Sequence, residues 1–102
     1  MKIYISGPIS GMPDGNRAAF EAAEKAVQDA GHDPVNPHNN GVADGATWAQ
    51  HMRTDIVMML GCDAVLMLAG WQKSKGACFE SWIADHLDVP VFFSIDQLPH
   101  AK

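Results

Sequence analysis

The 102-residue sequence has few cysteines, and they form no recognisable pattern. Cys62 and Cys78 belong to no CxxC or Cys/His spacing, so the sequence indicates no zinc site. Both fall in segments expected to be buried or helical, and we expect reduced core thiols in a cytoplasmic protein. The five histidines are scattered along the chain, so we assign no metal ligand and expect no cofactor.

Basic residues are also scarce: the sequence has 7 Lys and Arg but 12 Asp and Glu, which gives a formal net charge of −5. This balance argues against sequence-independent binding of a nucleic-acid polymer, which requires a basic face. No apolar run approaches the length of a membrane span, and the N-terminus lacks a signal-peptide layout. The length is that of one domain, residues 1–102, with a single modest core.

The sequence has no internal repeat and neither of the common nucleotide-binding fingerprints, GxGxxG and GxxxxGK[ST]. It does have β-rich segments alternating with helical ones. The expected strands are Lys2–Ser6, His32–Asn36, Asp63–Ala69 and Val89–Ser94. The expected helices are residues 16–30, a second one from the capping box Thr47-x-x-Gln50 to near Gly61, and residues 75–87. The tail from Ile95 to Lys102 is expected to be a short turn or a frayed end.

This β-α-β-α-β-α-β order predicts an α/β fold of a single domain. We expect a three-layer sandwich with a four- to five-stranded, mainly parallel sheet in a flavodoxin-like arrangement. Ligands of such sheets bind beyond the carboxyl ends of the strands. The glycine-rich loop 7–15 and the loop 70–74 are both expected at that edge.

Asp55 is the first candidate for chemistry. At ~100° per residue it falls within the apolar stripe of its helix, among Trp48, Met52, Ile56 and Met59. Ionised groups are rarely buried without a partner or a purpose. The alternative is an acid at the end of the stripe that caps a neighbouring backbone or pairs with Arg53.

Glu80 is the second candidate. It shares a helix face with Gly76, Ile83, Ala84 and Leu87. A competing stripe of Phe79, Trp82, Ile83 and His86 leaves Glu80 at the border. In that case Glu80 is a solvent-facing acid stabilised by the helix dipole.

Four further features lie near the expected ligand edge. The loop from Gly7 to Gly15 is expected to cradle a phosphate or sugar, or to be a plain turn. Ser74 and Gly76, helped by Lys73 and Lys75, are a candidate anion site, or a Ser N-cap beside two solvated lysines. Tyr4 either orients a carboxylate or packs in the core. Trp71 either stacks on a base or covers a core edge.

Together these segments resemble the nucleoside 2-deoxyribosyltransferase superfamily, which includes the 2′-deoxynucleoside 5′-monophosphate N-glycosidases. The resemblance rests on Tyr4-Ile5-Ser6-Gly7-Pro8-Ile9-Ser10-Gly11, Met52-Arg53-Thr54-Asp55, Cys62-Asp63-Ala64-Val65 and Ser74-x-Gly76-x-x-x-Glu80. The opening motif and the segment Gly-Trp-x-x-Ser-x-Gly-Ala are similar to those of a short bacterial and phage branch. Each motif is short, and their order and spacing carry the specificity.

The resemblance implies cleavage or transfer at the N-glycosidic bond of a nucleoside or nucleotide. Glu80 matches the nucleophile of the family, Asp55 the acid that protonates the leaving base, and Tyr4 the residue that positions the nucleophile. The implied substrate contacts are Gly7, Pro8, Ile9, Ser10, Gly11, Trp71, Ser74 and Gly76. The resemblance also implies a homo-oligomer.

This chain departs from the nucleotide hydrolases of the superfamily in the first loop, where Ser10 replaces a basic residue. The tail Leu98–Lys102 shows no equivalent of the segment that a neighbouring subunit supplies in the transferases. A non-catalytic sensor of a nucleotide or an ADP-ribose-like ligand is therefore an alternative function. A structural domain with incidental acids is a third.

Overall fold

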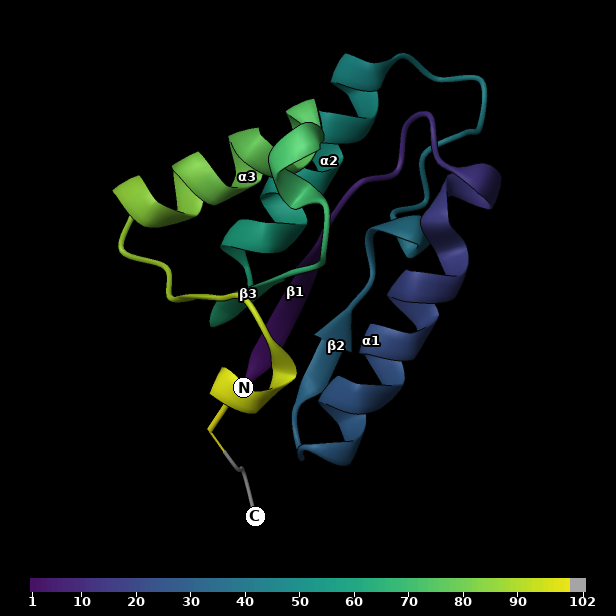
Figure 1. Ribbon diagram of the computed structural model, residues 1–102. Helices are drawn as coiled ribbons and strands as arrows, with labels where there is room; N and C mark the ends of the chain where they lie inside the picture. Colours follow the sequence, from purple (N-terminus) through teal and green to yellow (C-terminus); the bar gives the residue numbers. More distant parts are fainter. Residues whose placement is uncertain (100–102) are drawn as a thin grey trace.

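A computed structural model of the chain describes residues 1–99 and shows helices on both sides of a parallel sheet (Figure 1). The strands are β1 (Lys2–Ser6), β2 (Asp33–Val35), β3 (Ala64–Met67) and β4 (Val91–Phe92). The helices are α1 (Arg17–Asp29), α2 (Trp48–Leu60) and α3 (Lys75–His86). Short 3-10 turns occur at η1 (Pro13–Asn16), η2 (Pro37–Asn39), η3 (Trp71–Lys73) and η4 (Ile95–Gln97).

The four strands are all parallel and lie in the order β2-β1-β3-β4. This order matches the flavodoxin-like arrangement expected from the sequence, with four strands among residues 1–99. Strands β2, β3 and β4 are each shorter than the segments expected from the sequence. Pro90 precedes β4 and has no N–H to donate. Its carbonyl oxygen accepts a hydrogen bond of 2.9 Å from the Val65 N–H.

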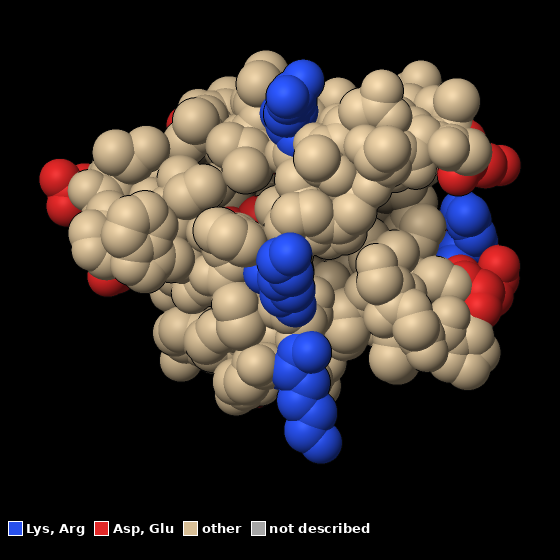
Figure 2. Space-filling model, turned by 90° about the horizontal axis from the view of Figure 1, so that it is seen from above, with Lys and Arg blue, Asp and Glu red and all other residues tan. Residues whose placement is uncertain are grey.

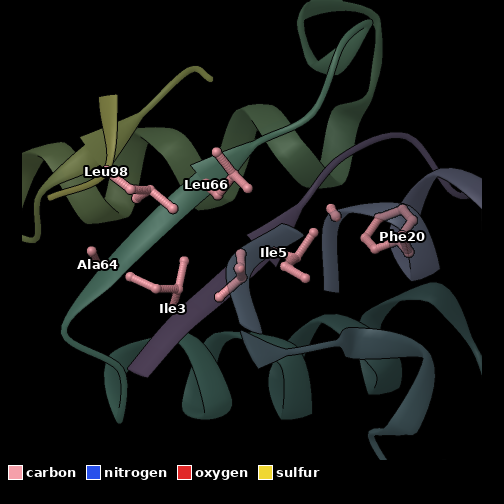
Figure 3. Packing of buried hydrophobic residues seen from close by; sticks show 8 residues of the cluster. Ile3, Ile5, Phe20, Ala64, Leu66 and Leu98 are labelled. Atoms are coloured by element: carbon pink, nitrogen blue, oxygen red, sulfur yellow. The ribbon is translucent and has the colours of Figure 1, made fainter. Parts of the chain in front are cut away.

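One face of the sheet is covered by α1 and the segment after η4. Ile3 and Ile5 of β1 point to this face together with Leu66 of β3 (Figure 3). They pack with Phe20 of α1 and with Leu98, which is 6% exposed. The C-terminal turn therefore closes the core, and the rest of the tail, residues 100–102, lies outside the described part of the chain.

The other face of β1 carries Tyr4 and Ser6, because successive residues of a strand point to opposite sides. This face packs against α2 and α3 through Met59 and Ala84. α2 begins with the expected capping box, in which Thr47 and Gln50 each bond the other's backbone N–H. Within residues 1–99 no helix is long and apolar enough to span a bilayer.

Gly7 follows β1 directly and lies very close to the end of β3. A Cβ at this position would lie 2.9 Å from the Cβ of Leu68. Only glycine therefore lets the first loop cross the end of β3 at this distance. The close approach holds the first loop at the carboxyl edge of the sheet.

Candidate active site

Glu80 is a buried acid at the centre of this edge. It lies on α3 and is only 4% exposed. Glu80 therefore lies on the buried face of α3 and not at the border of that face, where the competing apolar stripe would have put it. Phe79 and Trp82 instead face outward, at 47% and 60% exposure. The inward face of α3 consists of Ala77, Glu80 and Ala84.

Two hydroxyl groups of β1 hold the Glu80 carboxylate. The Tyr4 hydroxyl donates to Oε2 at 2.6 Å, and the Ser6 hydroxyl donates to Oε1 at 2.7 Å. Tyr4 and Ser6 reach the same side chain because they are two residues apart on one strand face. Each carboxylate oxygen keeps a lone pair that these donors do not use.

Asp55 is the second buried acid, on α2, and is 6% exposed. Its Oδ1 accepts a hydrogen bond of 2.8 Å from the side-chain amide of Asn40. The same amide nitrogen lies 3.2 Å from Nδ1 of His51, one helical turn before Asp55. The alternative pairing of Asp55 with Arg53 does not occur within residues 1–99, where both ion pairs lie elsewhere.

Both acids line one cleft of about 450 Å³. This volume lies in the range of small-molecule sites. In Figure 2, which views this face from above, an acidic side chain is visible in a hollow beside a basic one. The other lining residues come from the first loop, the loop before α2 and the starts of α2 and α3: Gly7, Ile9, Ser10, Asp44, Ala46, Trp48, His51, Met52, Lys73, Ser74, Lys75, Gly76 and Ala77.

Burial raises the pKa of Glu80 to about 7. The hydrogen bonds from Tyr4 and Ser6 oppose this shift, and the charge of Asp55 adds to it. Burial also raises the pKa of Asp55, against the bond from Asn40 and the nearby His51 and His38. The pKa of Tyr4 is raised by burial and then by the charge of Glu80, so Tyr4 remains a protonated donor.

The N-terminus of α3 forms one wall of the cleft. Ser74 is its N-cap, and its hydroxyl accepts from the Ala77 N–H at 3.2 Å. Gly76 lets α3 lie close to α2, since a Cβ there would lie 3.1 Å from the sulfur of Met52. The Lys75 ammonium lies 4.2 Å from the ring centroid of Trp48, a favourable cation–π geometry.

The structure brings most of the sequence-predicted residues to this cleft. Gly7, Ile9, Ser10, Asp55, Ser74, Gly76 and Glu80 line it, and Tyr4 lies directly behind Glu80. Pro8, Gly11 and Trp71 are not among its lining residues. Trp71 packs against Phe93, with ring centroids 5.7 Å apart, and lines a separate hollow. Trp48 is the tryptophan of the cleft.

Ser6, Asn40 and His51 belong to the site but were not among the residues predicted from the sequence. Ser6 could have been found, because it shares a strand face with Tyr4. His51 lies one turn before Asp55 on the same helix, which is also a local signal. Asn40 lies in a loop with no periodicity, and nothing local indicates its partner.

The cysteines require one correction. Cys78 is exposed and Cys62 half-buried, so Cys78 is not a core thiol. The reason is that α3 turns Cys78 outward with Phe79, on the side away from the sheet. Among the described residues, no three His, Cys, Asp or Glu side chains group in a way that could hold a metal ion.

Comparison with known proteins gives one family and one fold. A family model described as "Domain of unknown function (DUF4406)" matches residues 1–93. Among solved structures, the chain is similar to a 2-deoxyribosyltransferase from the psychrotolerant bacterium Bacillus psychrosaccharolyticus, described as a biocatalyst for the synthesis of nucleosides. The match has a TM-score of 0.70 and 18% identity, and covers 89% of this chain and 69% of that chain.

No curated protein matches the sequence. The solved structure establishes a nucleoside 2-deoxyribosyltransferase-like fold, as the motifs predicted. At 18% identity the likeness concerns the fold alone, and activity has to be argued from the residues of this chain.

Proposed function

The chain belongs to the DUF4406 family, and from this premise we propose that it cleaves or transfers at the N-glycosidic bond of a nucleoside or nucleotide. The single observation that carries the proposal is the convergence of Glu80 and Asp55, from separate helices, on one cleft at the carboxyl edge of the sheet. Two carboxyl groups beside one glycosidic bond can divide the roles of nucleophile and acid.

In the first step, an oxygen of Glu80 bonds to the anomeric carbon as the bond from that carbon to the base nitrogen breaks. The electron pair of the broken bond goes to the base, which takes a proton from Asp55. In the second step, water or another base attacks the anomeric carbon and releases Glu80, while Asp55 accepts the proton of the attacking group. The transition state of each step resembles an oxocarbenium ion.

The hydrogen bonds around the two acids support these roles. Tyr4 and Ser6 both donate to Glu80, which suits a carboxylate held ionised for attack. Burial is the main cause of the raised pKa of Glu80, and the negative charge of Asp55 adds to it, so protonation of Asp55 lowers the pKa of Glu80. A single proton on Asp55 therefore favours the ionised nucleophile, which is the combination that the first step needs.

The proposed substrate is a 2′-deoxyribonucleotide. Lys73, Ser74 and Lys75 line the cleft at the N-terminus of α3, where a phosphate would find positive charge. Ile9 and Trp48 offer apolar surface for a base. In this proposal residues 1–102 act as one cytoplasmic domain, which suits a chain whose two cysteines are unpaired.

We also propose a homo-oligomer, as the resemblance implies. Phe79 and Trp82 lie side by side on the outer face of α3 and are 47% and 60% exposed. Exposed apolar surface of this kind is a common contact between protein copies. Sedimentation velocity of wild type and Trp82→Glu tests it: the variant is expected to be smaller, and a monomeric wild type contradicts the proposal.

The function is tested by incubation with a panel of deoxynucleosides and their monophosphates, followed by chromatography for free base. Wild type is expected to release base, Glu80→Gln to release none, and Asp55→Asn to be slower by about 10²–10⁴-fold. Glu21→Gln, an exposed glutamate of α1, is the control. Tight binding of intact nucleotide without release supports the sensor instead. Neither binding nor release across the panel supports a structural domain.

A further inference from the structure

Asn40 makes three polar contacts beside Asp55. Its side-chain nitrogen donates to Oδ1 of Asp55 at 2.8 Å and lies 3.2 Å from Nδ1 of His51. Its side-chain oxygen accepts from the backbone N–H of Val42 at 2.9 Å. Asn40 is partly buried, in the loop that follows η2.

These contacts define the orientation of the amide. A backbone N–H can only donate, so the oxygen of Asn40 must face Val42. The NH2 group then faces Asp55 and His51, with one hydrogen for each. Nδ1 of His51 acts as the acceptor in this contact.

The orientation of Asn40 has a consequence for the atoms of Asp55. Oδ1 is an acceptor and is occupied by the amide of Asn40. When Asp55 is protonated, its hydrogen therefore belongs on Oδ2. This is the atom left to donate a proton to a leaving group.

We propose that Asn40 is a positioning residue that holds Asp55 so that Oδ2, rather than Oδ1, carries and delivers the proton. The inference rests on the proposed function, in which Asp55 is the acid. Asn40 does not touch the reacting atoms in this scheme. It acts through Asp55, and the Val42 contact keeps its own amide in place.

The surroundings of Asp55 set the direction of the pH effect. Burial raises the pKa of Asp55, and the hydrogen bond from Asn40, followed by His51 and His38, opposes this rise. Across the cleft, Glu80 and Tyr4 also interact with the charge of Asp55. Loss of the Asn40 donor is therefore expected to raise the pKa of Asp55 and to leave the other groups in place.

The experiment compares Asn40→Asp with wild type. An aspartate keeps the oxygen that accepts from Val42, and so preserves the turn, but it replaces the donor by a second acceptor. We expect kcat to fall by about 10-fold or more, a part of what a general acid contributes. The limb of the kcat profile that reports Asp55 is expected to move to higher pH, which a purely structural defect would not cause.

Asn40→Ala and Asn39→Ala complete the set. Asn40→Ala removes the donor without adding charge, so the limb that reports Asp55 is again expected to move to higher pH. Asn39 is exposed and adjacent in sequence, and Asn39→Ala is expected to keep the wild-type profile. An Asn40→Asp enzyme with wild-type kcat and an unmoved Asp55 limb overturns the proposal.

A measurement that needs no turnover separates this inference from the proposed function. The pKa of the Asp55 carboxyl, followed by carbon NMR in wild type and Asn40→Ala, is expected to be higher in the variant. An unchanged pKa overturns the inference even if the enzyme is active. If wild type releases no base from the panel, the proposed function fails and the role of Asn40 in proton delivery fails with it.

Discussion

The Tyr4 hydroxyl lies 2.6 Å from Oε2 of Glu80, although 76 positions separate the two residues in the chain. A buried phenol that donates to a buried carboxylate is a strong, charge-assisted contact. It joins the first strand to the third helix and at the same time orients the acid that faces the cleft. Stability and chemistry therefore depend on the same contact.

Tyr4→Phe removes this hydroxyl and keeps the ring. The free energy of unfolding at pH 8 is expected to fall by about 2 kcal/mol, the usual strength of a hydrogen bond to a charged group. Because the bond lowers the pKa of Glu80, its loss raises that pKa and moves the limb of the pH–rate profile that reports Glu80 to higher pH. Chemical denaturation and a pH–rate profile measure the two effects. A Glu80 limb that stays in place contradicts the role given to Tyr4.

Glu80 makes the stability depend on pH. Its pKa is raised from 4.5 to about 7 by burial, so the folded protein binds more protons than the unfolded chain between these values. Stability is then highest below the unfolded pKa and decreases as pH rises through 7, by about 3 kcal/mol in total.

Glu80→Gln removes the titrating group, and its free energy of unfolding is expected to lack this decrease. Urea denaturation from pH 4.5 to 8 is the measurement. Glu21→Gln is the matched control, because this exposed glutamate should retain the wild-type slope. Parallel stability profiles for wild type and Glu80→Gln would show that Glu80 titrates normally.

Trp48 lines the cleft, whereas Trp71 packs against Phe93 away from it. If Trp48 stacks on the base, Trp48→Ala is expected to raise KM by about 5- to 150-fold, since a base–aromatic stack contributes about 1–3 kcal/mol. Trp71→Ala is expected to lower Tm and to change KM much less. Steady-state kinetics and thermal unfolding of both variants distinguish these outcomes. A larger increase in KM for Trp71→Ala than for Trp48→Ala would indicate that the base stacks on Trp71, as expected from the sequence.

Gly7→Ala is expected to destabilise the fold. The added Cβ would lie 2.9 Å from the Cβ of Leu68, an atom attached directly to the backbone and unable to move away alone. Overpacking of this kind reduces the free energy of unfolding by about 1–3 kcal/mol. Gly45→Ala is the control, because that position has open space around it. Equal stabilities of the two variants would contradict the close approach.

Local sequence patterns determined most of the fold. β1 was predicted with its exact bounds, and the capping box at Thr47 placed the start of α2, because strand alternation and helix caps involve only nearby residues. The alternating order of elements predicted the parallel sheet. Helical periodicity placed Asp55 on a buried face, and for Glu80 it offered the buried face as one of two possible stripes.

Tertiary structure alone decided which groups meet. Asn40 lies in a loop without sequence periodicity, and its side chain donates a hydrogen bond to Asp55. Trp48, and not Trp71, borders the cleft. Periodicity indicates the face on which a side chain lies, but not the partner that packing brings to it. The raised pKa of Glu80 has the same origin, since burial and neighbouring charge belong to the folded molecule and to no segment of the sequence.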